Sequence, residues 1–282
     1  MDAKTLLFIG LAAMAVLYVA MVARCGWTTP TILQSAIGFV TAFFDTLGIG
    51  SFATTTFAYR LRGLVPVKLL PGTLNVGHAP ATVAQALIYT SIVPVDAATL
   101  VLMIVAACLG AWIGAGVVVH WPRRRIQIGM GIALMGAATL MFLQLLNLFP
   151  GGGVALELTG ARLALGLGGN FVLGALMMLG IGLYAPCMIL VSLLGMSPTA
   201  AFPIMMGSCA FLMPICTGQF VKSRTYHVQA ALGLALGGVP GVLVAAGVFW
   251  SLSLVAVRWL VVVVVIYTSM NMLLTAREER KP

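Results

Sequence analysis

The sequence predicts an all-α, polytopic integral membrane protein that contains two homologous repeats. Hydrophobic residues make up 61% of the 282 residues and charged residues only 7%, whereas a soluble globular domain carries about 25% charged residues. Nine apolar segments follow one another, and two of them, at corresponding places, are interrupted by the sequence Gly-Ile-Gly. Residues 1–282 are therefore expected to form a single transmembrane domain.

The order of the segments divides this domain. Only Lys4 precedes the first apolar segment, residues 6–22, and no suitable small-residue cleavage site follows it, so we expect a membrane span and not a signal peptide. The expected divisions are an extra N-terminal span in residues 1–30, a first repeat in 31–149, a connecting loop in 150–162, a second repeat in 163–275 and a hydrophilic tail in 276–282.

The two repeats align without a gap when the chain is shifted by 132 residues. Over the 33 positions 39–71 this shift gives ten identities, where about three would arise by chance in so restricted a composition. The identical pairs are Phe39/Phe171, Val40/Val172, Leu47/Leu179, Gly48/Gly180, Ile49/Ile181, Gly50/Gly182, Ala53/Ala185, Gly63/Gly195, Pro66/Pro198 and Pro71/Pro203. Many of them are glycine or proline, so the halves share their backbone irregularities.

These irregularities interrupt the apolar segments 31–59 and 163–194. A helix that crosses a bilayer needs about 20 apolar residues, and glycines within it expose backbone groups that lipid cannot satisfy. Two interrupted segments at matching positions in two halves are typical of the central site of a transporter.

The basic residues predict how the interrupted segments lie. If each crosses the membrane, nine spans result and Lys and Arg divide 8 to 7 between the two sides; if each returns to its own side, seven full spans remain and the division is 12 to 3. The positive-inside rule favours the second arrangement. It makes the repeats inverted and the C-terminus cytoplasmic, in a multi-pass protein of a bacterial inner membrane. The crossing arrangement stays open, because residues 31–47 could span a thin bilayer.

The candidate substrate site lies at the interruptions. We expect short helices to begin near Thr54 and near Pro186, since proline suits the first turn of a helix. Helix N-termini offer unpaired N–H groups and the positive end of the helix dipole, which suit an anion. The candidate substrate-binding residues are Gly48, Gly50, Ser51, Thr54, Thr55, Asn75, His78, Gly180, Gly182, Tyr184 and Ser208. The alternative is that single hydroxyls bond to backbone carbonyls and hold helices together.

Asp45 and His78 are the ionisable residues that lie clearly within apolar segments, and both are candidates for coupling transport to an ion. The alternatives make Asp45 a cap on the interrupted backbone and His78 a hydrogen-bonded interface residue. Gln85 and Gln219 are interpreted as packing amides.

Several functions are disfavoured. The five cysteines, Cys25, Cys108, Cys187, Cys209 and Cys216, lack metal-ligand spacing and are expected to be buried hydrophobes. Residues 151–153 are three glycines without the lysine of a phosphate-binding loop. The basic residues are scattered in short loops, which does not indicate nucleic acid. We therefore expect no enzyme, cofactor, metal site or nucleic-acid partner.

From about residue 32 to residue 273 the chain resembles the TauE/SafE family of sulfite and organosulfonate exporters. The resemblance rests on the two Gly-Ile-Gly sequences, on Pro186, and on the stretches 70–75 and 197–201 that follow them. The chain departs from the family in having Ser51-Phe52 and Leu183-Tyr184 where further glycines are common, and Thr54 where proline is common.

This resemblance implies a secondary transporter that exports a small sulfur-containing anion, such as sulfite or an organosulfonate, without ATP. An anion channel and a membrane-embedded sulfur-metabolism enzyme or assembly factor remain as alternatives. The expected partners are the small anion and the lipid bilayer. The coupling ion, proton or sodium, and the formation of a homodimer stay open.

Overall fold

The computed structural model describes residues 3–24, 26, 28–148, 153–180 and 182–248, and ten single positions between 259 and 276. Apart from the bridge between Ala155 and Met196, the regular structure of these residues is helical, which confirms the all-α prediction. The elements are α1 (Ala3–Ala23), α2 (Ile32–Thr46), α3 (Ser51–Leu61), η1 (Val67–Leu69), α4 (Leu70–Ile92), α5 (Ala97–Val118), α6 (Arg123–Leu145), α7 (Gly160–Met177), α8 (Tyr184–Leu193), η2 (Pro198–Ala200), α9 (Ala201–Ser223) and α10 (Val228–Val248).

Five of the described helices are long and apolar enough to cross a membrane: α1, α5, α7, α9 and α10. This supports a multi-pass membrane protein but differs in detail from the seven expected spans. Helix α4 contains Asn75, His78 and Gln85, and α6 begins with three arginines, which lowers their apolar character. The last part of the expected second repeat, residues 249–275, and the tail lie largely outside the described residues.

Local sequence explains where individual helices begin and end. Thr31 and Gln34 form a capping box at the start of α2, which satisfies two N–H groups that a helix leaves unpaired. The carboxylate of Asp96 accepts the N–H of Thr99 at the start of α5, over 2.7 Å. Helix α9 ends where Arg224 adopts a left-handed conformation, with φ 52°.

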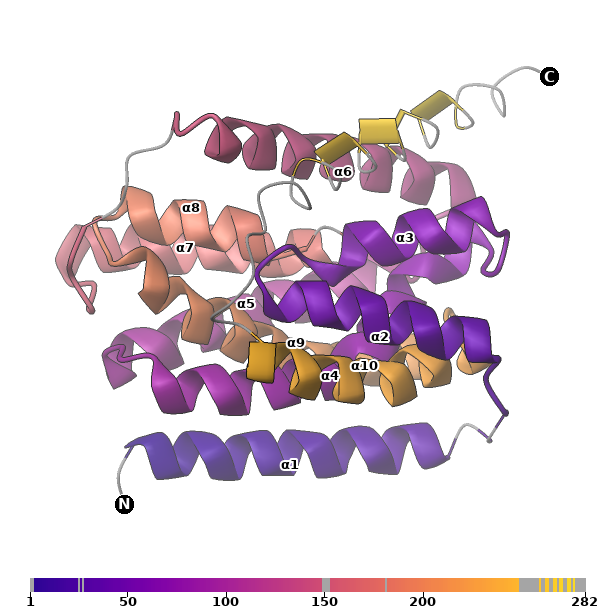
Figure 1. The fold of residues 1–282 in the computed structure, drawn as a ribbon, viewed down its shortest axis with the longest axis horizontal. Helices are drawn as coiled ribbons and strands as arrows, with labels where there is room; N and C mark the ends of the chain where they lie inside the picture. Colours follow the sequence, from indigo (N-terminus) through magenta and orange to yellow (C-terminus); the bar gives the residue numbers. More distant parts are fainter. Residues whose placement is uncertain are drawn as a thin grey trace.

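The helices run between two ends of the molecule (Figure 1). We call one end the basic end, because residues such as Arg24, Arg62 and Arg224 lie there. At this end the N–H of His227 donates to Oγ1 of Thr73 and the amide of Gln229 donates to the carbonyl of Thr29, both over 2.9 Å. These bonds bring together the starts of α2, α4 and α10. At the opposite far end, the loop 153–159 pairs with the residues before α5 and after α8.

Helices α2 and α3 form a hairpin whose two outer ends lie at the basic end, and α7 and α8 form a second hairpin whose outer ends lie at the far end (Figure 1). Contacts at the far end bear this out, because Arg162 at the start of α7 lies beside Gly195 just after α8. The turns of both hairpins therefore point toward the middle of the molecule.

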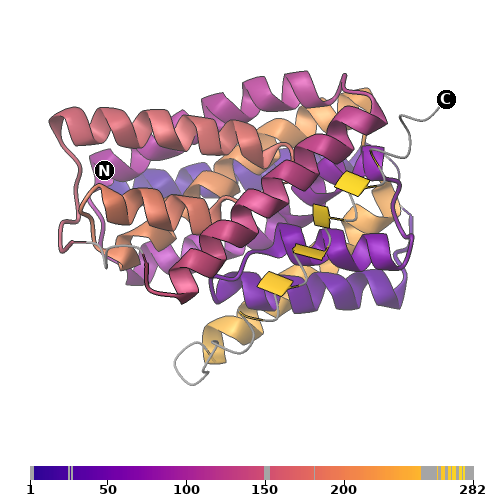
Figure 2. The same cartoon turned by 90° about the horizontal axis from the view of Figure 1, so that it is seen from above.

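Helix α4 and helix α9 pack against each other in opposite directions. Gly72 near the start of α4 lies against Thr225, beyond the end of α9, and Thr82 farther along α4 bonds to Met213, nearer the start of α9. On either side of this pair, α10 packs on α2 and α5 packs on α7. Helix α1 covers one side of the molecule and α6 lies on the opposite side (Figure 1), where it crosses the other helices obliquely (Figure 2).

Two close backbone approaches hold the hairpins to their neighbours. A Cβ atom at Gly110 of α5 would lie 1.9 Å from the carbonyl oxygen of Phe171 in α7, and one at Gly241 of α10 would lie 2.3 Å from the carbonyl oxygen of Phe39 in α2. Only glycine fits either position. Small residues of this kind allow membrane helices to pack closely, where no hydrophobic effect drives association.

Candidate functional site

The candidate site is built around the turns of the two hairpins. Gly48 and Gly50 adopt φ values of 86° and 88° between α2 and α3, and Gly180 adopts 87° after α7, a left-handed region that favours glycine. The short helices begin at Ser51 and Tyr184, three and two residues before the expected positions near Thr54 and Pro186. The middle residue of the second turn, at position 181, lies outside the described residues.

Asp45 is buried in the last turn of α2 and is held by two hydrogen bonds. One carboxylate oxygen accepts the N–H of Ser51, the first residue of α3, over 2.5 Å. The other accepts a hydrogen bond from the amide of Gln85 in α4, over 3.0 Å. The carboxylate thus lies at the positive end of the α3 dipole, where a negative charge is stabilising. The structure gives Asp45 the bond that the capping interpretation requires.

Gln85 connects the two hairpins. Its amide nitrogen also donates to Oγ1 of Thr46, over 3.0 Å, and its amide oxygen accepts the hydroxyl of Tyr184 at the start of α8, over 2.7 Å. A continuous chain of hydrogen bonds therefore runs from Asp45 through Gln85 to Tyr184. The sequence interpretation of Gln85 as a packing amide missed this role. The available signal was an amide placed at membrane depth in the helix that follows the first interruption.

His78 lies in α4 beside α3. Its Nε2 atom is 3.0 Å from the hydroxyl oxygen of Thr55, and its ring stacks on Phe52 with the centroids 5.9 Å apart. Among the described residues its Nδ1 atom has no hydrogen-bond partner, and the same holds for the amide oxygen of Asn75 one turn earlier. The predicted residues Thr55, Asn75 and His78 are therefore buried on neighbouring helices, and Asn75 and His78 each keep one hydrogen-bonding atom without a partner among the described residues.

Two other predicted site residues form hydrogen bonds outside this group of side chains. The hydroxyl of Thr54 donates to the carbonyl of Ser51 over 2.9 Å, which is the structural alternative for single hydroxyls. Ser208 of α9 accepts a hydrogen bond from Asn170 of α7, over 3.2 Å. Asn170 also donates to the carbonyl of Met103 in α5. Among the described residues no hydrogen bond joins Ser208 to the Asp45–Gln85–Tyr184 chain of hydrogen bonds. Substrate binding by Thr54 and Ser208 stays a prediction from the sequence.

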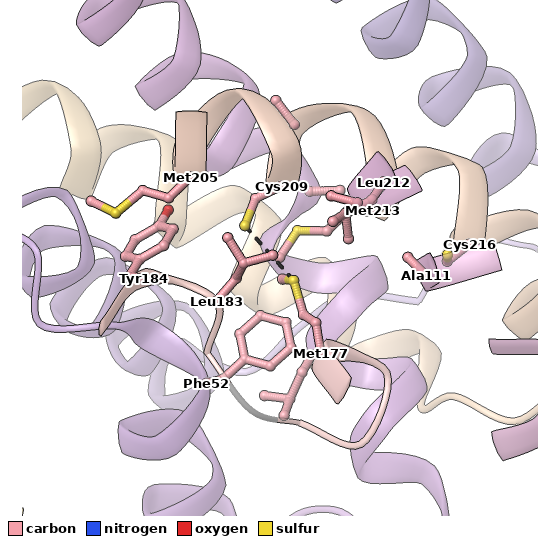
Figure 3. Packing of buried hydrophobic residues seen from close by; sticks show 14 of the residues in the cluster. Phe52, Ala111, Met177, Leu183, Tyr184, Met205, Cys209, Leu212, Met213 and Cys216 are labelled. Carbon is pink, nitrogen blue, oxygen red and sulfur yellow. Dashed lines mark hydrogen bonds between the residues drawn. The ribbon is translucent and has the colours of Figure 1, made fainter. Parts of the chain in front are cut away.

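The surroundings of the second turn are more apolar than those of the first and include several sulfur atoms. The thiol of Cys209 lies 3.7 Å from the thioether sulfur of Met177, and Leu183, Tyr184 and Met205 are close by (Figure 3). Met177 occupies the position that corresponds to Asp45 in the 132-residue alignment. The two hairpins therefore differ chemically near their turns, one carrying a carboxylate and the other sulfur atoms. Among the described residues no group of three or more His, Cys, Asp or Glu could hold a metal ion.

The two short helices also differ in how their N-termini are satisfied. The N-terminus of α3 is capped by Asp45, whereas the residue before α8, Leu183, makes no side-chain capping bond. A Cβ atom added at Gly182, immediately before it, would meet no atom within 4 Å. A helix leaves its first N–H groups without partners inside the helix, and in α8 these are the groups of Tyr184 and Ala185, because Pro186 has none. Space at Gly182 thus lies beside the start of α8, while at α3 a carboxylate already takes the place of an anion.

No protein-family model, no curated protein and no solved structure matches the chain. The resemblance to the TauE/SafE family therefore stays a prediction from the sequence.

Proposed function

We propose that the protein is a secondary transporter of a small anion, which works by alternating access around the turns of the two hairpins. The observation that carries the proposal is the hydrogen-bond chain Asp45–Gln85–Tyr184, because it links two hairpin turns that approach the centre from opposite ends. Discontinuous helices that meet at mid-depth, with a helix N-terminus facing the substrate, are the usual construction of such sites.

The packing supports inverted repeats. In the alignment of the two halves, α2 corresponds to α7, α5 to α10 and α4 to α9. The contact of α10 with α2 therefore corresponds to the contact of α5 with α7. Helix α4 packs antiparallel against its own counterpart, α9. The two close approaches correspond as well, because Gly110 and Gly241 are 131 residues apart and their partners Phe39 and Phe171 are 132 residues apart. An antiparallel pair on the symmetry axis is what a two-fold axis in the membrane plane requires.

The charges support a membrane orientation. Nine lysines and arginines lie at the basic end, namely Arg24, Arg60, Arg62, Lys68, Arg123, Arg124, Arg125, Lys222 and Arg224. In the remaining described chain, Lys4 and Arg162 lie at the far end. We therefore place the basic end in the cytoplasm. Both hairpins are then re-entrant, α2–α3 from the cytoplasm and α7–α8 from outside.

The anion is placed at the N-terminus of α8, beside Gly182 and the hydroxyl of Tyr184. Here the N–H groups of Tyr184 and Ala185, which begin the helix, and the helix dipole would attract negative charge, and the missing side chain at Gly182 leaves room for it. Such a site suits a compact oxyanion. Among these, sulfite and organosulfonates are the class that the TauE/SafE resemblance implies, and we propose export of that class.

Asp45 supplies a reason for coupling to protons. Two like charges about 8 Å apart repel by about 2 kcal/mol at an effective dielectric constant of about 20, which corresponds to about 30-fold in affinity. An ionised Asp45 near the anion therefore disfavours its binding, and protonation removes the repulsion. Proton and anion then bind together and leave together, so export proceeds when the outward gradient of the anion exceeds the inward gradient of the proton.

Gln85 can transmit this protonation to Tyr184. While Asp45 is ionised, the amide nitrogen of Gln85 faces the carboxylate and its oxygen holds the Tyr184 hydroxyl hydrogen. A protonated Asp45 donates instead, so the amide reverses: its oxygen accepts from Asp45 and its nitrogen donates to the oxygen of Tyr184. The hydroxyl hydrogen of Tyr184 is then released and can donate to the anion.

Flux measurements in proteoliposomes test the proposal. We expect saturable, pH-gradient-driven uptake of sulfite or sulfoacetate, tested beside thiosulfate and simple carboxylates. Saturation at millimolar substrate and counterflow distinguish a carrier from a channel. Non-saturable, voltage-driven current would contradict alternating access, and the absence of flux for every anion tested would contradict the anion proposal itself.

A further inference from the structure

Two apolar grooves flank α1, one at each end of the molecule. The first, of about 390 Å³, lies between α1, α5 and α9 and is lined by residues that include Leu7, Val105 and Phe211. The second, of about 370 Å³, lies between α1, α4 and α10 and is lined by residues that include Ala23, Pro80 and Leu236. Since α1 runs from the far end to the basic end (Figure 1), the first groove is nearer the far end. We call them the far-end groove and the basic-end groove.

The grooves correspond to each other through the repeat. A shift of 131 residues, which maps the start of α4 onto the start of α9, also maps lining residues of one groove onto those of the other. The corresponding pairs are Val101/Leu232, Ile104/Ala235, Val105/Leu236, Cys108/Val239 and Phe211/Pro80. The two grooves thus have similar apolar walls, one toward each end of the molecule. A variant in one groove can therefore serve as the control for a variant in the other.

The charges at the mouths of the grooves differ. Exposed Arg24 directly follows Ala23, which lines the basic-end groove. The sulfur atom of Met21, near the end of α1, lies 3.4 Å from the position that a Cβ atom of Gly218 in α9 would take. Lys222, which is exposed, follows Gly218 by one turn of α9. By contrast, the described part of the far end carries two basic residues, Lys4, one turn before Leu7, and Arg162, together with the two carboxylates of Asp96 and Glu157, so its formal charges cancel. Among the described residues the other carboxylate is the buried Asp45.

We propose that the basic-end groove binds one anionic phospholipid, with an acyl chain between α1 and α10 and the phosphate beside Arg24 and Lys222. The groove walls are apolar, as an acyl chain requires, and the basic groups lie at the depth of the headgroups. Basic pockets between membrane helices recognise anionic headgroups in this way. The far-end groove offers similar walls without a net positive charge at that end, so we expect it not to select for headgroup charge. This inference does not depend on the transported substrate.

Native mass spectrometry of the detergent-purified full chain tests the proposal, with phosphatidylglycerol and phosphatidylcholine as probes. We expect one phosphatidylglycerol to bind more tightly than phosphatidylcholine. Arg24→Gln should reduce this preference by about fivefold, the contribution of one basic group near a membrane surface. Binding of the two lipids with equal affinity to the unaltered protein would overturn the proposal.

A matched pair of tryptophan variants locates the bound lipid. Leu236 and Val105 correspond in the repeat and are 50% and 49% exposed, so either can be enlarged without crowding the core. Leu236→Trp should fill the basic-end groove and abolish the preferred phosphatidylglycerol adduct, while Val105→Trp should retain it. Loss of the adduct in both variants, or only in Val105→Trp, would overturn the proposed location.

Discussion

The hydroxyl of Tyr184 donates a hydrogen bond to the amide oxygen of Gln85 over 2.7 Å. This contact ties the start of α8 to the middle of α4 and so joins the two halves of the protein at the turns. Both side chains are buried, Gln85 completely, and a buried polar group that loses its partner costs about 1–3 kcal/mol. Any movement of one hairpin relative to α4 must therefore supply new partners to both groups, and a bound anion can be one of them.

Asp45→Asn tests proton coupling. Asparagine keeps an oxygen for the N–H of Ser51, but its amide nitrogen now faces Gln85, which favours the reversed amide and imitates protonated Asp45. We expect the KM for sulfoacetate, which stays ionised, to become independent of pH and pH-gradient-driven accumulation to be lost, while exchange persists. In the unaltered protein the KM should fall as pH falls, because protonation of Asp45 favours the anion. Normal pH dependence in Asp45→Asn would make Asp45 purely a cap.

Tyr184→Phe tests the relay through Gln85. Removing the hydroxyl should weaken anion binding by about 10- to 100-fold, the value of a hydrogen bond to a charged group. The loss should be larger at acidic pH, where the relay releases the hydroxyl hydrogen, than at alkaline pH, where Gln85 holds it. Tyr89→Phe is the matched control, because the hydroxyl of Tyr89 donates to the carbonyl of Thr46 over 2.6 Å. It should reduce thermal stability without changing the KM, and an equal pH-independent effect of both variants would rule out the relay.

The sequence predicted the parts of this site that depend on local backbone. Glycines marked both turns, and Asp45 immediately before the first turn allowed a capping role, which the bond to Ser51 provides. Gln85 could not be assigned in this way, since its partners Asp45 and Tyr184 are 40 and 99 residues away. The hydrogen bond of Thr54 to the Ser51 carbonyl has a local cause, because a threonine in a first helical turn readily bonds to a carbonyl three residues earlier.

Gly182→Ala tests the anion position at α8. A Cβ atom here meets nothing within 4 Å, and the backbone of Gly182 is not in the left-handed region, so the variant should fold normally. We expect about a tenfold or greater increase in KM, because the methyl group occupies the space through which an anion reaches the N–H groups. Gly50→Ala is a poorer test, since φ 88° strains any other residue. An unchanged KM in folded Gly182→Ala would move the site elsewhere.

Single cysteines test the orientation of the hairpins. In a cysteine-free background, Arg62→Cys after α3 and Arg224→Cys after α9 should react with a membrane-impermeant maleimide only from the cytoplasm. Glu157→Cys, before α7, should react only from outside. All three side chains are exposed, so failure to label would not reflect burial in the fold. Labelling of Arg62→Cys and Arg224→Cys from opposite sides would contradict the re-entrant arrangement.

Gly110→Ala and Gly241→Ala test whether the two halves use equivalent helix contacts. Each new methyl group would overlap a carbonyl oxygen, of Phe171 at 1.9 Å or of Phe39 at 2.3 Å, and must push two helices apart. Overpacking of this kind costs about 1–3 kcal/mol, so both variants should unfold at similarly lowered temperatures in detergent. Gly168→Ala in α7 is the control, because its Cβ atom meets nothing within 4 Å and alanine favours a helix by about 1 kcal/mol over glycine. The two interfaces share no residue, so the losses should add in the double variant. If Gly110→Ala were as stable as Gly168→Ala, the contact between α5 and α7 would not need the close approach, and the equivalence of the halves would lose this support.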